Sequence, residues 1–221
     1  MLCVDVSGGS ELDIAPSKII CLIKSYASHA EEMNGKVSER PIFFLKPPSS
    51  LLPNGGVIEI PYTVNKLHHE IELAVIIGKT GRSIPLEEAS MHIGHYIPML
   101  DITARDLQGQ AKKSGLPWSE AKGFDTFAPL GPEAVPSKGF RWRGRRIWLD
   151  VNGERRQDSN TDLLLFSVDR IVADLSMVMT LEKGDIIMTG TPAGVGPLHD
   201  GDRIKAGIDG FKEMEFTVSN L

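Results

Sequence analysis

Apolar and polar residues alternate in short runs along most of this chain, and this pattern predicts many short β-strands with few helices. Alternation with period two is typical of a strand, because successive side chains point to opposite faces of a sheet. Asn152-Gly153 divides one run into a two-residue hairpin. The runs expected to form strands are residues 18–23, 42–46, 57–60, 69–77, 96–101, 146–157, 186–189, 203–208 and 213–219.

Three segments have helical patterns instead. Residues 85–94 begin with a proline, which the first turn of a helix tolerates, and residues 104–113 end close to Gly115. Ser167 can cap a helix that runs to about Met179, with apolar residues at helical spacing. The chain is therefore predicted to be a β-rich α+β protein with a few short helices. We expect residues 1–16 to form an N-terminal extension and residues 17–221 to form a single catalytic domain.

Composition and charge exclude some classes of function. The formal net charge is −5, which argues against a general nucleic-acid binder but leaves room for a local positive pocket. Two cysteines offer no disulfide framework, and no apolar run reaches the roughly 18 residues of a membrane helix. The first sixteen residues contain acids and no arginine, unlike a signal or transit peptide. We expect a protein of the cytoplasm or the mitochondrial matrix, without nucleic-acid or membrane partners.

Glu70 and Glu72 are the first candidates for chemistry. Two residues apart on a strand, they project from one face, so their carboxylates repel one another unless water, a cation or a basic group compensates. A bare Glu-x-Glu pattern is more often a solvated strand face. Here a long apolar run follows the pair, and Asp101 ends another predicted strand. Three carboxylates without cysteine would suit Mg²⁺, Mn²⁺ or Ca²⁺ rather than structural zinc.

Other candidates are weaker when each is taken alone. On a short helix, His29 and Glu32 would face the same way, and the carboxylate could orient the imidazole as a base. Taken alone, however, the pair is better explained as an exposed helix pair. Lys46, Arg105 and Lys122 are cationic candidates, yet most lysines are solvated. The glycine-rich stretch 189–196 lacks the ending of a P-loop; it could bring backbone N–H groups to a carboxylate, or be a simple turn.

Taken together, several motifs resemble the fumarylacetoacetate hydrolase family, and its acylpyruvase and oxaloacetate decarboxylase branch in particular. The resemblance extends from about residue 18 to the C-terminus, with the motifs in the family's order. The motifs are Phe-Leu-Lys-Pro at 44–47, His-His-Glu-Ile-Glu-Leu at 68–73, Asp-Ile-Thr-Ala-Arg-Asp-Leu-Gln at 101–108, Gly-Leu-Pro-Trp at 115–118, Ala-Lys at 121–122 and Thr-Gly-Thr-Pro at 189–192. As a set they are far more specific than any one of them.

The resemblance implies a fumarylacetoacetate-hydrolase-type β-roll, usually a homodimer, that acts on a small 2-oxo acid. It implies a Mg²⁺ or Mn²⁺ ion held by Glu70, Glu72 and Asp101. It also implies a water-activating dyad of His29 and Glu32 on a lid helix, with Lys122 adding positive charge at the enolate that leaves. The substrate-contacting positions that it implies are Arg105, Gln108, Lys122 and Thr191, with Lys46 as an addition.

The function implied is hydrolysis of the C–C bond of acylpyruvates, giving pyruvate and a carboxylic acid, together with decarboxylation of oxaloacetate. An oxaloacetate tautomerase is the alternative enzyme, and a 2-oxo acid binding protein without turnover is an alternative from another class. The chain departs from the family at the start of the lid, where Ile23 and Lys24 replace glycine and arginine. Isoleucine adopts a positive φ poorly, and lysine lacks the planar fork of arginine. Lid closure and specificity are therefore expected to differ.

Overall fold

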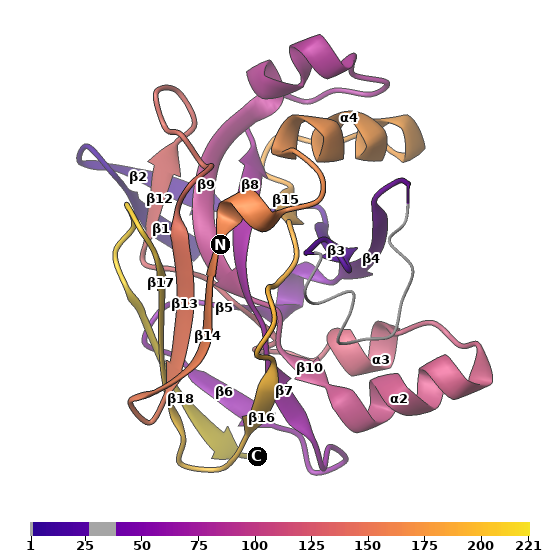
Figure 1. Cartoon of the computed structure of the whole chain (residues 1–221), viewed down its shortest axis with the longest axis vertical. Coiled ribbons are helices and arrows are strands. Elements are labelled where there is room, and N and C mark those ends of the chain that lie inside the picture. The colour runs from indigo at the N-terminus through magenta and orange to yellow at the C-terminus, as the bar shows by residue number, and fades with distance from the viewer. Residues whose placement is uncertain (1, 27–38) are drawn as a thin grey trace.

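The structure, a computed structural model, describes residues 2–26 and 39–221, and two large sheets form its framework (Figure 1). The first sheet has eight strands in the order β2-β1-β12-β9-β8-β15-β3-β4. These strands are β1 (Leu2–Val6), β2 (Ser10–Ile14), β3 (Ile19–Ile23), β4 (Ile42–Lys46), β8 (Ile71–Ile77), β9 (Ile93–Leu100), β12 (Glu133–Pro136) and β15 (Ile186–Met188). The residues of the expected N-terminal extension thus add a hairpin to one edge of this sheet, where β1 pairs with β12.

The second sheet has five strands in the order β14-β13-β17-β18-β6 and packs against β8 through β13 and β17. Its strands are β6 (Val57–Ile60), β13 (Arg146–Val151), β14 (Glu154–Asn160), β17 (Arg203–Ile208) and β18 (Met214–Asn220). Two small sheets complete the β-structure. The first has three strands in the order β10 (Thr103–Ala104), β7 (Leu67–His69) and β16 (Gly196–Leu198). The second pairs β5 (Leu51–Leu52) with β11 (Ala128–Pro129).

The few α-helices lie on the right in Figure 1, and the strands of the five-stranded sheet lie on the left. Among the described residues they are α2 (Arg105–Ser114), α3 (Ser119–Lys122) and α4 (Val168–Val178), with 3₁₀ turns at Pro48–Ser50, Leu86–His92 and Thr161–Leu163. The prediction of a β-rich α+β fold with few short helices is confirmed. In the described part of the chain, no helix is long and apolar enough to cross a membrane.

The hydrophobic core lies between the two large sheets, and β8 forms its centre. Every residue of β8 is buried, with Ile71 and Leu73 in the core that the sheets share and Ala74 in a second cluster on the other face. The predicted apolar face opposite Glu72 is therefore present. Burial on both faces explains why the alternation in this strand is broken by a continuous apolar run.

Local signals in the sequence placed several elements correctly. Asn152 and Gly153 both have positive φ, as a type I′ hairpin turn requires, and they join β13 to β14. The Ser167 hydroxyl accepts a hydrogen bond from the Arg170 N–H at the start of α4, and α2 ends at Gly115 in the left-handed conformation. The prediction of a helix over residues 85–94 was only partly right, because Leu86–His92 is a 3₁₀ helix, whose first turn closes from the Glu88 N–H to the Pro85 carbonyl.

Candidate active site

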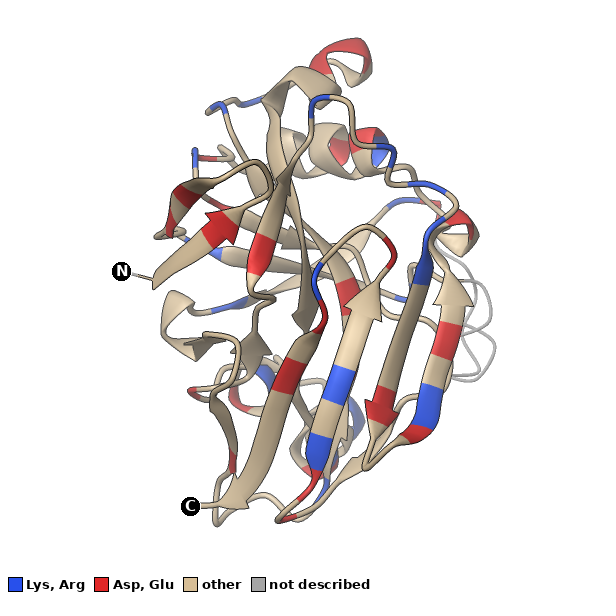
Figure 2. Ribbon diagram, turned by 90° about the vertical axis from the view of Figure 1, so that its left-hand side faces the viewer, with Lys and Arg blue, Asp and Glu red and all other residues tan. Residues whose placement is uncertain are grey.

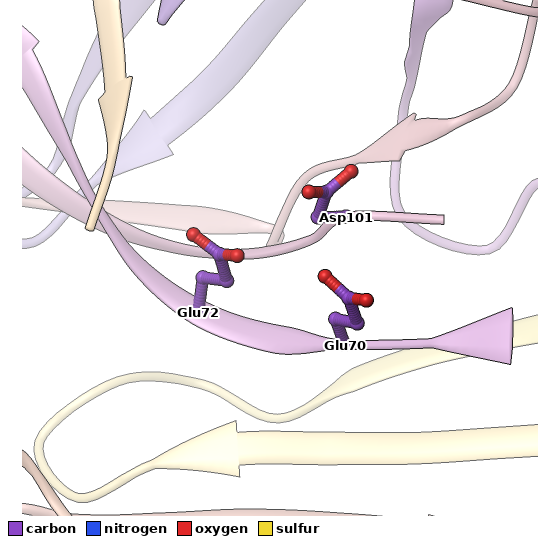
Figure 3. Close-up of side chains that lie close together, drawn as sticks. All are labelled: Glu70, Glu72 and Asp101. Carbon is purple, nitrogen blue, oxygen red and sulfur yellow. The ribbon is translucent and has the colours of Figure 1, made fainter. Parts of the chain in front are cut away.

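Three buried carboxylates meet where β8 and β9 run side by side. Glu70 directly precedes β8, Glu72 lies within it, and Asp101 directly follows β9. The Asp101 N–H donates to the Glu70 carbonyl at 2.8 Å, which fixes the ends of the two strands together. The carboxylates point to the same side of the strands (Figure 3), with one ligand oxygen of each within 4.8 Å of the others. At 1–6% exposure, these side chains cannot rely on water to screen their repulsion.

Lys122 and Arg105 neutralise part of this negative charge. The Lys122 Nζ lies 2.6 Å from Asp101 Oδ2 and 3.3 Å from Glu70 Oε2, and Arg105 forms an ion pair with Glu70. Burial alone would lower the pKa of Lys122, but the carboxylates of Asp101 and Glu70 hold that pKa above its ordinary value. Burial and the Arg105 charge lower the pKa of His68 to about 4, so its Nδ1 is free to accept from the Arg105 Nε at 3.3 Å.

The Lys46 ammonium is hydrogen-bonded to backbone carbonyl groups. Its Nζ donates to the carbonyls of Ile102, Lys122 and Phe127 at 2.7–2.9 Å, which uses all three ammonium protons. The same Nζ lies 2.9 Å from Asp101 Oδ1, but that oxygen accepts no hydrogen bond from the described residues. Lys46 therefore holds three carbonyl groups and one carboxylate oxygen of Asp101 around a single buried ammonium.

The triad fits a hard divalent cation. Asp101 presents Oδ1, whose contact among the described residues is the ion pair with Lys46. Burial, Asp101 and Glu70 together raise the pKa of Glu72 well above its ordinary value. The Gly190 N–H, which donates to Glu72 Oε2 at 2.6 Å, and Lys122 offset this only in part. A buried set of three carboxylates, with oxygen as the only ligand atom, suits Mg²⁺ or Mn²⁺.

The triad opens into a cavity of about 430 Å³, which brings most of the predicted site residues together. Phe44 and Trp118 form part of its wall with ring centroids 5.8 Å apart, and the Lys112 ammonium lies 4.8 Å from the Trp118 ring. Partial desolvation lowers the pKa of Lys112, and the charges of Arg105 and Lys24 lower it further. The lining residues are Leu22, Ile23, Lys24, Ile42, Phe44, Glu70, Glu72, Asp101, Arg105, Gln108, Lys112, Trp118, Lys122 and Thr191.

The glycine-rich stretch closes one side of this cavity. Gly190 brings its N–H to Glu72, as one of the two sequence interpretations expected, and a Cβ at this position would lie 1.7 Å from the Ser25 hydroxyl. Ser25 donates to the Thr189 carbonyl, and Thr191 donates to the Ile71 carbonyl at 2.8 Å. The stretch is therefore bound to the strand that carries the acidic residues, and Thr191 faces the cavity.

The predicted dyad cannot be placed, since His29 and Glu32 lie outside the described residues. At the altered start of this segment the residue with positive φ is Lys24, at 55°, and not Ile23. The expected conflict of isoleucine with that conformation therefore does not arise.

Two buried polar residues near the site were missed in the sequence. Gln157 is fully buried in β14, and Tyr26 is fully buried just before the undescribed segment. The Tyr26 hydroxyl has no hydrogen-bond partner among the described residues, and burial and Glu72 raise its pKa. No local signal distinguishes either residue from an ordinary surface or core position.

Comparison with known proteins identifies the family of the chain. Residues 18–219 match the family model described as "Fumarylacetoacetate (FAA) hydrolase C-terminal". The chain is 47% identical over 203 residues to a protein of Arabidopsis thaliana named oxaloacetate tautomerase FAHD1, mitochondrial, covering 91% of each sequence. It is 43% identical over 200 residues to the human protein of the same name, covering 90% of each sequence.

Solved structures show the same fold. The crystal structure of fumarylpyruvate hydrolase from Pseudomonas aeruginosa in complex with Mn²⁺ and pyruvate is similar with a TM-score of 0.93 and 37% identity, over 100% of this chain and 96% of that one. A structure of 5-carboxymethyl-2-hydroxymuconate delta-isomerase from Mycobacterium smegmatis is similar with a TM-score of 0.84 and 38% identity, over 96% and 86% of the two chains. The predicted fold class is thereby confirmed.

Proposed function

Because the chain belongs to the fumarylacetoacetate hydrolase family, we propose that it is a Mg²⁺- or Mn²⁺-dependent enzyme whose first activity is enol–keto tautomerisation of oxaloacetate. The observation that carries this proposal is the buried acidic triad, which opens into a cavity whose other charged side chains are basic. Relatives in a plant and in human that share nearly half of the sequence are named for this reaction. The proposal therefore takes the alternative enzyme of the sequence analysis as the first candidate.

The chain's own residues would bind and polarise a 2-oxo acid. A bound divalent cation would supply a Lewis acid. Lys122 keeps its positive charge because its pKa is raised, and it would stabilise negative charge that develops on the 2-oxo oxygen. Arg105 and Gln108, joined by a 2.8 Å hydrogen bond, would orient a carboxylate of the substrate in the same cavity.

The tautomerisation itself needs one proton to leave and one to arrive. In the enol-to-keto direction the O–H proton leaves and C3 accepts a proton, and no water is consumed. His29 and Glu32 remain the predicted acid–base pair. Gly190 and Thr191 would hold the substrate side of the cavity in place, since both are hydrogen-bonded to the β8 region.

Hydrolysis of acylpyruvates, with decarboxylation of oxaloacetate, is the second candidate. All these reactions pass through an enolate of a 2-oxo acid, so they require the same positive charge near the 2-oxo oxygen. The similarity to fumarylpyruvate hydrolase favours this candidate. So does the cavity, whose volume of about 430 Å³ and apolar lining of Leu22, Ile42 and Phe44 would accept an acyl chain longer than oxaloacetate.

Ultraviolet absorbance of the enol tests the proposal directly. We expect purified protein to accelerate the enol–keto conversion of oxaloacetate with Mg²⁺ or Mn²⁺ and to lose this activity with excess EDTA. Glu72→Gln removes one of the three anionic ligands and should lower both the affinity for Mn²⁺ and the rate by at least about 100-fold. Glu87→Gln, at an exposed glutamate of the Leu86–His92 turn, is the matched control.

The same assay separates the candidates. Loss of acetylpyruvate absorbance with formation of pyruvate would identify the hydrolase, and pyruvate formed from oxaloacetate would identify the decarboxylase. Binding of Mn²⁺ and pyruvate without turnover of either substrate would refute the enzyme and leave the binding protein. The homodimer and the compartment, cytoplasm or mitochondrial matrix, remain predictions; both relatives described above are named as mitochondrial.

A further inference from the structure

Gln157 is a buried residue on a strand that is otherwise turned towards solvent. Its side chain is 0% exposed, whereas Arg155 and Arg156 before it and Asp158 after it are exposed. The pairing of β13 with β14 shifts here, from Leu149 opposite Gln157 to Asp150 opposite Arg155, so Arg156 is the extra residue of a β-bulge. A bulge changes the direction of the side chains that follow it, and here it turns Gln157 to the same buried face as Leu149.

The carboxamide of Gln157 joins two segments of the active site. Its Oε1 lies 3.1 Å from His69 Nδ1 and accepts from the Ile71 N–H at 3.1 Å. Its Nε2 donates to Thr191 Oγ1 at 2.8 Å and to the Pro192 carbonyl at 3.0 Å. Both oxygen lone pairs and both amide protons are therefore used. The first two partners flank Glu70, and the last two belong to the glycine-rich stretch that lines the cavity.

The orientation of this amide is determined by the backbone. The Ile71 N–H can only donate, so it must meet the oxygen, and the Pro192 carbonyl can only accept, so it must meet the nitrogen. It follows that His69 carries its proton on Nδ1 and donates to Gln157.

The glycine-rich stretch also touches the bulge directly. Gly194 has a φ of 92°, and a Cβ there would lie 2.2 Å from the Arg156 carbonyl oxygen. A Cβ at Gly196 would lie 3.3 Å from His69 Nε2. Only a glycine at 194 allows this approach. The glycine-rich stretch therefore packs against the bulged strand and is also hydrogen-bonded to the Gln157 carboxamide.

We propose that Gln157 is a positioning residue for the substrate site: from the bulge of β14 it holds Thr191 in register with the strand of metal-ligating carboxylates. This inference rests on the proposed function, since Thr191 is a predicted substrate contact. Thr191 both donates to the Ile71 carbonyl and accepts from Gln157. Without the carboxamide, the Thr191 hydroxyl keeps its hydrogen bond to the Ile71 carbonyl but loses the one from Gln157. The Pro192 carbonyl also loses its hydrogen bond from Gln157.

The test compares Gln157→Met with the wild type in Mn²⁺-loaded protein, with pyruvate as the probe. Methionine keeps the length of the side chain and removes all four hydrogen bonds. We expect the calorimetric Kd for pyruvate and the KM for oxaloacetate to rise at least about fivefold, the effect of about one lost hydrogen bond. The value of kcat should change less, and the Kd for Mn²⁺ should stay within about twofold. Thr191→Val combined with Gln157→Met should be no worse than Thr191→Val alone.

Ser176→Ala is the matched control for a purely structural effect. The buried Ser176 hydroxyl accepts from the Ile84 N–H and donates to the Ala173 carbonyl, away from the cavity. The Ser176→Ala substitution should lower the Tm without changing the Kd for pyruvate. If Gln157→Met behaves in the same way, or if its effect adds in full to that of Thr191→Val, the inference is overturned.

A second variant guards against a Gln157→Met protein that does not fold. Gly194→Ala leaves the carboxamide intact and forces the stretch away from the Arg156 carbonyl. It should raise the Kd for pyruvate similarly, and an unchanged Kd would overturn the inference. Failure of the wild type to turn over any 2-oxo acid would refute the proposed function instead, since the Kd readout does not depend on turnover.

Discussion

Lys122 is the residue whose loss would most change the balance of charge in the site. Its ammonium compensates Glu70 and Asp101, and all three side chains are buried. Removal of one partner from a buried ion pair costs about 3–5 kcal/mol, because the remaining charge is left unpaired. We expect Lys122→Met to lower the free energy of unfolding of the metal-free protein by about 3 kcal/mol. A bound cation should restore most of this loss.

The measurement is the rise in Tm on addition of Mg²⁺ or Mn²⁺, which should be larger in Lys122→Met than in the wild type. Turnover of oxaloacetate should fall at least about 100-fold in the same variant, even at saturating metal. Lys113→Met, at an exposed position of α2, should match the wild type in both respects. If the metal raised the Tm of Lys122→Met and of the wild type equally, Lys122 would not be the group that compensates the charges of Glu70 and Asp101.

At this scale, the sequence predicted residues whose chemistry shows in a local pattern. Glu70 and Glu72 share a face because their spacing matches the period of a strand, and the structure brings them together with Asp101, the third predicted carboxylate. Gln157 could not be predicted, because its burial depends on the bulge at Arg156 and strict alternation carries no signal of a bulge. Nor could the role of Lys46, which depends on carbonyls 56 to 81 residues away in the chain.

Among the elements, β3 and β15 depend on one carboxylate. Asp185 is fully buried and accepts from the Ser17 N–H and hydroxyl, the Lys18 N–H and the Glu182 N–H at 2.7–3.2 Å, and it pairs with the Lys18 ammonium. Burial alone would raise the pKa of Asp185, but Lys18, the Glu182 N–H and the Ser17 hydroxyl hold it below its ordinary value. These contacts start the parallel pairing of Ile19 with Ile186.

We expect Asp185→Asn to lower the free energy of unfolding at pH 7 by about 2–3 kcal/mol, because an amide cannot accept all of these hydrogen bonds. The pKa of Asp185 is lower in the folded than in the unfolded chain, so its stabilisation is present above the ordinary aspartate pKa of about 3.9 and is lost as the pH falls through the folded value. Urea unfolding at pH 7 and near pH 3 should show the two proteins converging.

Asp174→Asn is the control for this prediction. Asp174 pairs with Arg170 four residues away on the exposed face of α4, so its loss should change stability by about 0.5 kcal/mol or less. A difference between wild type and Asp185→Asn that persists undiminished near pH 3 would mean that the variant acts through packing rather than through charge.

Elements with local signals were predictable, and their partners were not. The hairpin at Asn152 and the cap at Ser167 follow from residues within a few positions of each other. By contrast, β3 pairs with β15 across more than 160 residues, and β1 pairs in parallel with β12, so their places in the sheet depend on contacts that no local pattern encodes. The predicted strand over residues 69–77 corresponds to β8 from Ile71 onward, whereas His69 is the last residue of β7, which joins a different sheet.

Across the whole molecule, charge is distributed unevenly. Basic and acidic residues occur in mixed order along the strands of the five-stranded sheet (Figure 2). Asp150 pairs with Arg155, and Lys205 pairs with Glu213. The chain as a whole has a net charge of −5. In its described lining, however, the cavity has four cationic and three anionic side chains, and a divalent cation would add two positive charges. An anionic substrate would thus meet a positive cavity in a negative protein.

This contrast predicts how activity depends on salt. Because the Debye length falls from about 30 Å at 0.01 M to about 8 Å at 0.15 M, attraction by the cavity should be screened over this range. We expect kcat/KM for oxaloacetate, at saturating Mg²⁺, to fall about threefold or more, with kcat nearly constant. The decline of kcat/KM with salt concentration should be the same in sodium chloride and in sodium nitrate, since screening does not depend on the identity of the anion.

Lys112 and Lys113 provide the comparison that assigns this effect to the cavity rather than to net charge. Lys112 lines the cavity beside Trp118, whereas its neighbour Lys113 is absent from the lining in the described structure. Each substitution by methionine changes the net charge equally, so a dependence on net charge alone would give two identical salt profiles. We expect Lys112→Met to lower kcat/KM at low salt by about threefold and to flatten its decline, and Lys113→Met to follow the wild type. Identical profiles for the two variants would place the attraction outside the cavity, and a rate that increases with salt would show that the negative net charge outweighs the positive cavity for an approaching anion.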